Sequence, residues 1–284
     1  MWSELFSIGP VRIHSYGVML AIGFLAGILW MRREGRAKGL GTDVVLDFGL
    51  WTLLSSVLAA RALFVALNWS DFAASPRDIL WLWRGGLSFH GGVLGAVAAA
   101  CVFGPRRKIP VGVLADAAAP AIPLGYALAR IGCFLNGCCH GCPTHLPWGV
   151  RFPATPGDPT VLTEPSHPTQ IYASLMSLAV FGFILLLKPH FHARGQVFAA
   201  YLAIYSLQRY VIEFWRAECS AVPFGPLAPL TQAQVVSVAI GVIAAAFLLV
   251  EEWVRLHRAG EPPEPAPSEA EEPKVPPKRK RMRR

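Results

Sequence analysis

Four polar side chains in the C-terminal half of the chain recur at helical spacing. Tyr205, Arg209, Glu213 and Arg216 follow one another at intervals of four, four and three residues. At about 100° per residue they fall within roughly 80° of arc, so a helix presents them as one polar stripe. Arg209 and Glu213 can neutralise each other as an i,i+4 pair. Two arginines against one glutamate leave a surplus positive charge, which suits an anionic headgroup.

Two more arginines border or interrupt apolar sequence. Arg130 follows the apolar run 110–129, and Arg61 lies inside the run 44–69. A charge at membrane depth costs about 2.5–3.5 kcal/mol on insertion scales, so such a side chain faces a cavity or a partner. Arginine binds phosphate bidentately and keeps its charge when buried. We therefore predict a phosphate-binding pair of Arg130 and Arg209, with Arg61 as a possible third cation.

His90 is the candidate proton acceptor. It lies in the glycine-rich stretch 85–92, where glycines permit a tight turn and close backbone approach. An imidazole with a pKa near neutrality can take a proton from a thiol or hydroxyl nucleophile. A structural histidine is the alternative interpretation, and His14, His140 and His167 are expected on the same side of the molecule.

The cysteines cluster within one loop. Cys101 and Cys219 stand apart, whereas the others are Cys133, Cys138, Cys139 and Cys142. The segment 139–142 resembles half of a metal site, but no second half follows at zinc-like spacing, so we predict no metal ligand. A disulfide would suit an oxidising compartment. Packed free thiols and a nucleophilic cysteine are the remaining interpretations.

Long apolar runs must position these residues. Of the 284 residues, 54% are hydrophobic and only 15% are charged, whereas soluble domains carry about 25% charged residues. A span needs about 20 mostly apolar residues, and several runs reach or approach that length. The runs are 15–31, 44–69, 91–104, 110–129, 170–187, 196–207 and 233–250. We predict an all-α, polytopic membrane protein with about seven transmembrane helices.

Basic residues are sorted by loop. Clusters of lysine and arginine follow the first, third, fifth and seventh runs, which places the N-terminus outside and the C-terminus in the cytoplasm. The net charge of +8 therefore does not indicate a nucleic-acid partner. The candidate residues named above all fall on the outer side.

A change of composition divides the chain. We predict a transmembrane domain over residues 1–258 and a disordered cytoplasmic tail over 259–284, which is rich in proline and glutamate and then basic. The basic end has the composition for contact with anionic lipids, and a merely solvated tail is the alternative.

Five sequence blocks, taken in order, resemble the prolipoprotein diacylglyceryl transferase family. Any one block is weak, whereas the ordered set is specific and covers roughly residues 13–216. The blocks are 14–17 (HSYG), 86–92 (GLSFHGG), 130–137 (RIGCFLNG), 167–172 (HPTQIY) and the stripe 205–216.

The resemblance implies a seven-helix enzyme of the bacterial inner membrane with its site open to the outer leaflet. Such an enzyme moves the diacylglyceryl group of phosphatidylglycerol to the lipobox cysteine of a prolipoprotein, the first step of lipoprotein maturation. It releases glycerol phosphate and needs no cofactor. The implied catalytic residues are His90, Arg130 and Arg209. The implied substrate-binding residues are Tyr16, Arg61, Asn136, Gly141, Tyr205, Glu213 and Arg216.

The chain departs from the family pattern at three positions. Ala129 replaces an expected glycine, Cys133 an asparagine and Cys138 an acidic residue. A cysteine-rich paralogue with another lipid or acceptor, or a non-enzymatic or redox membrane protein, is therefore an alternative. A transporter for an anionic molecule fits less well, because the sequence has no evident repeat and the inner halves of the runs are apolar.

Overall fold

The computed structural model describes residues 4–8, 11–73, 75–81, 85–155, 158–216 and 230–259. Of the predicted tail 259–284, only Ala259 is among them, as the last residue of a helix. The rest of the tail and Cys219 lie outside the described residues.

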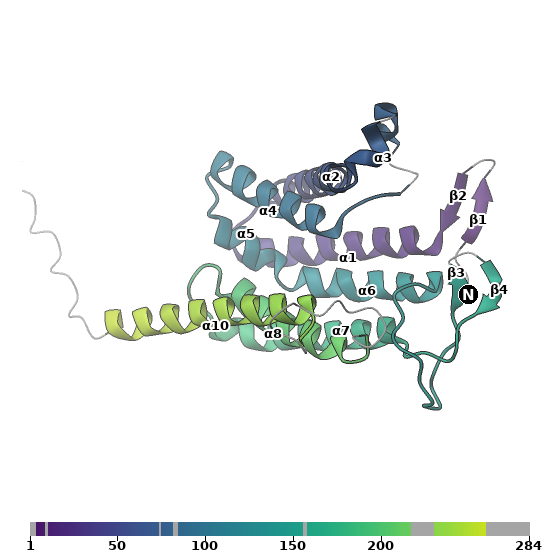
Figure 1. Ribbon diagram of the computed structural model, residues 1–284. Coiled ribbons are helices and arrows are strands. Elements are labelled where there is room, and N and C mark those ends of the chain that lie inside the picture. Colours follow the sequence, from purple (N-terminus) through teal and green to yellow (C-terminus); the bar gives the residue numbers. More distant parts are fainter. Residues whose placement is uncertain are drawn as a thin grey trace, which may run out of the picture.

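Each of the seven apolar runs is helical (Figure 1). The fourth run is broken near Pro120 into two helices that are bent by 43°. The helices of the runs are α1 (Ser15–Ala37), α2 (Thr42–Leu67), α4 (Phe89–Arg106), α5 (Val111–Ala118) with α6 (Ala121–Asn136), α7 (Thr169–Leu187), α8 (Gln196–Glu213) and α10 (Gln232–Ala259). The shorter helices are α3 (Trp69–Ala73), η1 (Pro76–Leu80) and η3 (Lys188–His190).

The fold is mostly helical rather than all-α, because the described chain also contains two short hairpins. Strand β1 (Glu4–Ile8) pairs antiparallel with β2 (Val11–His14), and β3 (Pro153–Thr155) pairs antiparallel with β4 (Asp158–Leu162). Pairing satisfies the backbone groups of segments too short for a helix. Both hairpins lie at the same end of the helical bundle (Figure 1).

Four of the described helices are long and apolar enough to cross a membrane, and the bent α5–α6 pair makes up to five candidates. The four are α1, α2, α7 with η3, and α10. Helices α4 and α8 have 18 residues each and do not qualify. Helix α8 carries the polar stripe, which lowers its mean hydropathy. These apolar helices indicate a multi-pass membrane protein. The count of seven spans remains a prediction.

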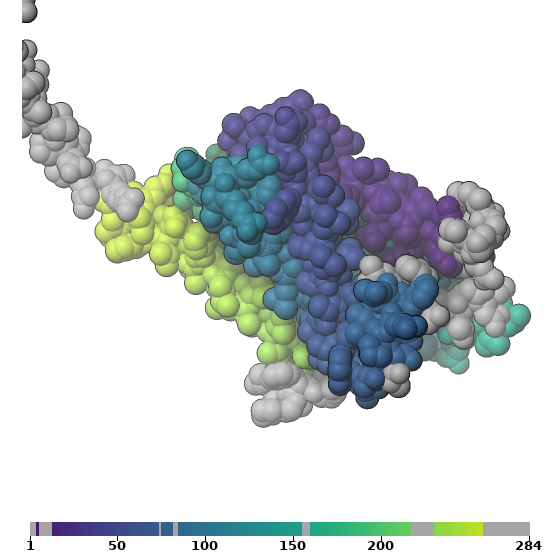
Figure 2. Space-filling model, turned by 90° about the horizontal axis from the view of Figure 1, so that it is seen from above, coloured from purple at the N-terminus to yellow at the C-terminus, as the bar shows by residue number. Residues whose placement is uncertain are grey.

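Large apolar side chains cover the outside of the bundle. Leu29, Leu58, Leu94, Leu186 and Leu249 are all more than 60% exposed. They belong to five different helices, and Figure 2 shows α2 and α4 over the middle of one face. So much exposed leucine is unusual for a protein surrounded by water and is expected where hydrocarbon is the solvent.

Helices α2 and α4 pack through glycines. A Cβ atom on Gly91 would lie 2.4 Å from the carbonyl oxygen of Ala59, and one on Gly95 would lie 2.4 Å from that of Ser55. The Ser55 hydroxyl donates a hydrogen bond of 3.0 Å to the carbonyl of Gly95. Small residues allow this close approach of two backbones, as is common between membrane helices.

Polar side chains join the helices that carry the candidate site. The Ser174 hydroxyl on α7 donates to the carbonyl of Ala127 on α6 at 3.0 Å. The Gln208 amide on α8 donates to the Ser177 hydroxyl at 2.7 Å and to the carbonyl of Ala173 at 3.2 Å. These bonds fix the mutual positions of α6, α7 and α8.

A buried carboxylate holds the start of α8. Asp116 on α5 is 3% exposed. It accepts hydrogen bonds from the backbone N–H groups of Gly195 at 2.8 Å and Phe198 at 3.0 Å. It thereby satisfies donors that a helix start leaves unpaired.

We expect Asp116→Ala to lower the thermal stability of the protein in detergent by several degrees. The substitution leaves two partly buried N–H groups without their acceptor, at a cost of up to about 1–3 kcal/mol each. Asp47→Ala is the matched control, because Asp47 forms an exposed pair with Arg107 that is worth about 0–1 kcal/mol. Equal melting temperatures for the two variants would contradict the capping role of Asp116.

Candidate functional site

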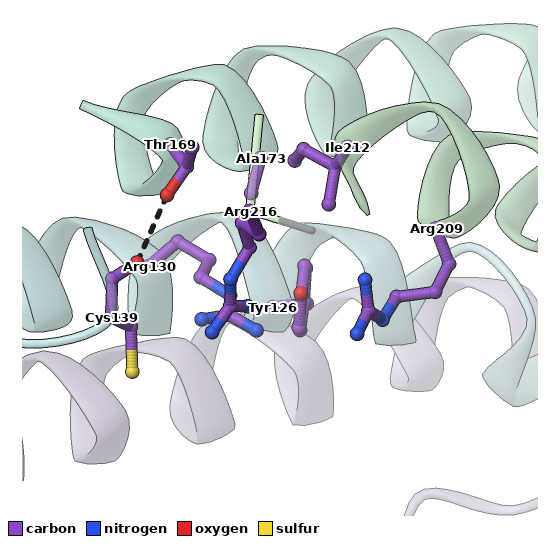
Figure 3. Close-up of a pocket in the computed structure, with 8 residues that line it drawn as sticks. All are labelled: Tyr126, Arg130, Cys139, Thr169, Ala173, Arg209, Ile212 and Arg216. Atoms are coloured by element: carbon purple, nitrogen blue, oxygen red, sulfur yellow. Dashed lines mark hydrogen bonds between the residues drawn. The ribbon is translucent and has the colours of Figure 1, made fainter. Parts of the chain in front are cut away.

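A small hollow, open at its mouth, lies among α6, α7 and the end of α8. Figure 3 shows the guanidinium groups of Arg130, Arg209 and Arg216 turned towards the same space. The residues that line it are Tyr126, Arg130, Cys139, Thr169, Ala173, Arg209, Ile212 and Arg216. The structure thus brings together the predicted phosphate-binding pair and the second arginine of the stripe.

Glu213 holds the Arg209 side chain in place by an ion pair. A guanidinium N–H of Arg209 donates to Oε2 of Glu213, four residues later on α8. Glu213 is 6% exposed, and its Oε1 accepts a hydrogen bond of 3.1 Å from the Thr231 hydroxyl. Both oxygens of the carboxylate are therefore occupied. The neutralising i,i+4 pair that the sequence suggests is present, and it also fixes where Arg209 points.

Arg130 stands inside a helix rather than after one. The sequence places it just beyond the fourth apolar run, whereas α6 continues to Asn136, because the residues after Ala129 keep forming helix. Its guanidinium lies over the ring of Tyr126, 4.7 Å from the centroid, a cation–π contact one helical turn away. The Tyr126 ring meets Tyr205 of α8 edge to face at 5.9 Å. Tyr205 thus supports the hollow through Tyr126.

The loop after α6 forms one wall of the hollow and is held by buried polar side chains. Thr169 and Gln170 at the start of α7 are 2% and 0% exposed. The Thr169 hydroxyl donates to the carbonyl of Cys139 at 2.9 Å, drawn in Figure 3. The Gln170 amide donates to the carbonyl of Cys138 at 2.8 Å. Both contacts use the main chain of the loop, so they position it without regard to its side chains.

Main-chain bonds continue this attachment at Gly141 and Cys142. The N–H of Gly141 donates to the carbonyl of His167 at 2.9 Å, and the N–H of Cys142 donates to that of Trp215 at 3.0 Å. A Cβ on Gly141 would lie 2.5 Å from the carbonyl oxygen of Trp215. The sequence predicts that Gly141 binds substrate. In the structure it occupies a position where a side chain would overlap Trp215 and Thr169.

The electrostatics of the hollow favour an anion. None of the eight described residues that line it is acidic, and three are arginines. The Cys139 thiol has a lowered pKa because the thiols of Cys133 and Cys138 hydrogen-bond to it, and because Arg130 and Arg216 lie nearby. The arginines can hold a phosphate by charge and by several N–H donors at once.

The cysteines of the loop do not share one state. Cys142 is disulfide-bonded, as in the disulfide interpretation of the loop. Cys101, Cys133, Cys138 and Cys139 are free thiols.

Arg61 does not reach the hollow. It is 6% exposed and donates to the backbone carbonyls of Asp78, Ile79, Gly85 and Gly86 at 2.6–2.9 Å. These carbonyls belong to the connection between α2 and α4. In this structure Arg61 organises that connection, whereas the sequence suggested a phosphate ligand.

We expect Arg61→Lys to lower the melting temperature of the protein, because one ammonium group cannot serve four carbonyls spread over this connection. Differential scanning fluorimetry in detergent would measure the loss. Arg77→Lys, an exposed position on η1, should leave the melting temperature unchanged. A stable Arg61→Lys protein would refute the structural role.

Three other predicted residues, Tyr16, Asn136 and His90, are not among the residues that line the hollow. Tyr16, 39% exposed, is the second residue of α1, and its Cα would lie 3.3 Å from a Cβ on Gly132 of α6. Asn136 is the last residue of α6. His90 is exposed in the first turn of α4. The proton-acceptor role of His90 stays a prediction.

Sequence reasoning missed Tyr126 and Thr169 as parts of the site. Tyr126 precedes Arg130 by four residues, a spacing that puts both on one helix face. Thr169 belongs to the 167–172 block that was singled out only for resemblance. Both signals were therefore present in the sequence.

Comparison with known proteins shows the family of the chain. A family model described as prolipoprotein diacylglyceryl transferase matches residues 3–250. The chain belongs to this family of transferases. Relatives named phosphatidylglycerol–prolipoprotein diacylglyceryl transferase are found in a Nostoc species, with 34% identity over 87% of this chain and 89% of the relative. Those of Geobacillus kaustophilus and Bacillus velezensis are 35% and 34% identical over 86% of this chain and 90% of each relative.

Proposed function

We propose that the protein transfers the diacylglyceryl group of phosphatidylglycerol to the lipobox cysteine of prolipoproteins, and that the hollow with its three arginines holds the phosphate. The observation that carries this assignment is the convergence of Arg130, Arg209 and Arg216 on one space in a chain of this family. The names of the relatives state both substrates.

In the proposed reaction the acceptor thiolate attacks the glycerol carbon that carries the phosphate. A C–S bond forms, and the C–O bond to phosphate breaks with its electron pair staying on the phosphate oxygen. The phosphodiester thus leaves as glycerol phosphate with one more negative charge. Arg130 and Arg209 stabilise this charge as it develops, which is where fixed cations lower a barrier most.

The acceptor thiol must lose its proton before or during the attack. His90 is the proposed acceptor of that proton, and Tyr16 and Asn136 are proposed to orient the headgroup. A reaction of this kind needs no cofactor, since no electrons are exchanged with a third partner.

The proposed setting is the bacterial inner membrane. Seven spans with the N-terminus outside and the C-terminus in the cytoplasm would put the hollow at the outer leaflet. The basic residues after alternate apolar runs support this orientation. Prolipoproteins would then reach the site by their membrane-embedded signal segments.

A direct transfer assay tests the function. Purified full-length protein in detergent is mixed with phosphatidylglycerol and a lipobox peptide with one cysteine, and mass spectrometry follows the diacylglyceryl mass on that thiol. We expect product with phosphatidylglycerol and none with phosphatidylethanolamine, whose leaving group carries a cation. Folded protein without product on either lipid would favour a paralogue with another donor or acceptor.

A further inference from the structure

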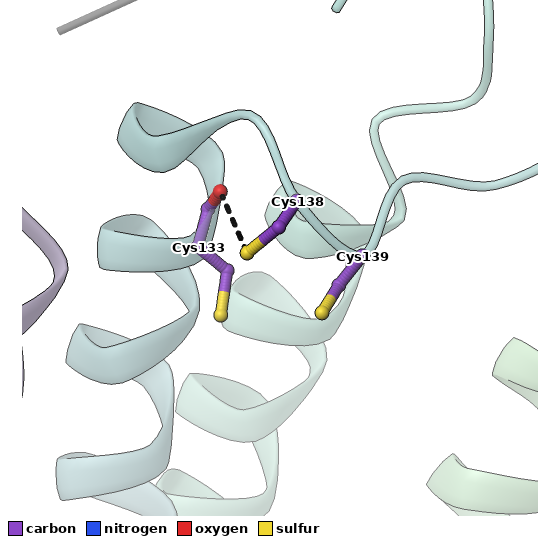
Figure 4. Close-up of side chains that lie close together, drawn as sticks. All are labelled: Cys133, Cys138 and Cys139. Atoms are coloured by element: carbon purple, nitrogen blue, oxygen red, sulfur yellow. Dashed lines mark hydrogen bonds between the residues drawn. The ribbon is translucent and has the colours of Figure 1, made fainter. Parts of the chain in front are cut away.

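Three free thiols meet at the end of α6. The sulfur atoms of Cys133, Cys138 and Cys139 all lie within 4.8 Å of one another. Figure 4 shows Cys133 on the helix and the other two on the loop that turns back over it, with the three sulfurs facing a common point. No spacing rule in the sequence groups these three, because the turn after α6 brings them together.

The backbone is arranged to hold this geometry. Gly137 ends α6 in the left-handed conformation at φ +76°, which reverses the chain towards the helix. Cys139 itself has φ +65°, a conformation that residues with a side chain rarely adopt and that persists where the surroundings enforce it. Thr169 and Gln170 hold the carbonyls of Cys139 and Cys138, and Cys133 is buried. The thiols are therefore brought together before any ligand arrives.

We propose that Cys133, Cys138 and Cys139 bind one thiophilic cation, Zn²⁺ or Cu⁺. Thiolate ligands select such soft ions. With metal–sulfur bonds of about 2.3 Å, the sulfurs bound to one ion lie about 4 Å apart. Small side-chain rotations that move each sulfur by less than about 1 Å would therefore bring the three cysteines to this spacing. Three thiolates suit trigonal Cu⁺, or Zn²⁺ with an exchangeable fourth ligand.

The charge around the cluster supports the same ion class. Three thiolates exceed the charge of either cation, so the complex carries a net negative charge. Arg130 and Arg216 act electrostatically on Cys139 and compensate that excess. Cys139 also lines the hollow, so the bound ion would lie one side chain away from the proposed phosphate site. This differs from the expectation of no metal, which rested on ligand spacing along the chain.

Metal titration of the full-length protein tests the proposal without any transfer reaction, so its outcome is independent of the proposed function. Reduced, metal-free protein in detergent is titrated with Zn²⁺ against a chromophoric chelator, and separately with Cu⁺ against a copper(I) chelator. We expect one equivalent of one of these ions per chain. Cys139→Ser and Cys133→Ser should bind at least 100-fold more weakly, whereas Cys101→Ser, at an exposed thiol on α4, should bind like the wild type.

A second experiment uses only the wild type, so that its result does not depend on the folding of a variant. It measures whether the bound ion protects the thiols from alkylation. The bound ion should slow iodoacetamide labelling of Cys133, Cys138 and Cys139 and leave labelling of Cys101 unchanged. The proposal is overturned by wild-type protein that takes up neither ion stoichiometrically, or by full affinity in a folded Cys139→Ser variant. It is equally overturned if freshly isolated protein contains a disulfide among the three thiols.

Discussion

Arg209→Ala should lower the rate of diacylglyceryl transfer by about 100-fold or more, and Arg130→Ala should do the same. Each removes a fixed cation from the place where the departing phosphate gains charge, and the loss of one such donor costs about 10²–10³ in rate. The two residues come from different helices, α8 and α6, and both line the hollow. The transfer assay with phosphatidylglycerol and a lipobox peptide measures both variants.

The controls for this prediction follow from the partners of each arginine. Arg151→Ala, at an exposed position of the loop between α6 and α7, should transfer at the wild-type rate. Arg209→Ala leaves the buried Glu213 with the Thr231 hydroxyl, so the melting temperature must be measured beside the rate. Arg209→Lys keeps a cation for Glu213 but loses the planar fork, and we expect an intermediate rate. Wild-type rates in both alanine variants would refute the phosphate-binding role.

Gly141→Ala should reduce transfer by about 10- to 100-fold although it removes no functional group. The added methyl would lie 2.5 Å from the carbonyl oxygen of Trp215 and 2.7 Å from Cγ2 of Thr169. One of them must move, and Thr169 lines the hollow while Trp215 immediately precedes Arg216. A displacement near 1 Å at a reacting centre costs about 10²-fold.

Gly182→Ala is the matched control, because a Cβ at that position on α7 meets no heavy atom within 4 Å. It should leave both the rate and the melting temperature unchanged. If Gly141→Ala transfers at the wild-type rate in folded protein, the close packing around that glycine does not position the site.

Regular, local patterns account for what the sequence predicted well. All seven apolar runs are helical because hydrophobicity over such lengths leaves the backbone no better way to satisfy its polar groups. The pairing of Arg209 with Glu213 followed from i,i+4 spacing alone. The sequence predicts that Arg130 and Arg209 meet, because a cation in or beside an apolar run must face a cavity or a partner.

Contacts that depend on irregular chain segments were beyond such reasoning. The position of Arg61 in an apolar run suggests a further phosphate ligand. Its partners are instead backbone carbonyls of the irregular connection between α2 and α4, and sequence periodicity does not predict the path of that connection. The meeting of Cys133 with Cys138 and Cys139 depends on the left-handed turn at Gly137. The seven-span count stays a prediction: α4 and α8 are not among the candidate spans, and the polar stripe lowers the mean hydropathy of α8.

The attachment of the loop after α6 through its peptide groups has an evolutionary consequence. Thr169 and Gln170 grip the carbonyls of residues 139 and 138, and Gly141 and Cys142 are held by their N–H groups. Substitutions at 138 and 139 therefore leave the wall of the hollow in place. A lineage can therefore acquire thiols at these two positions while keeping the arginine site intact.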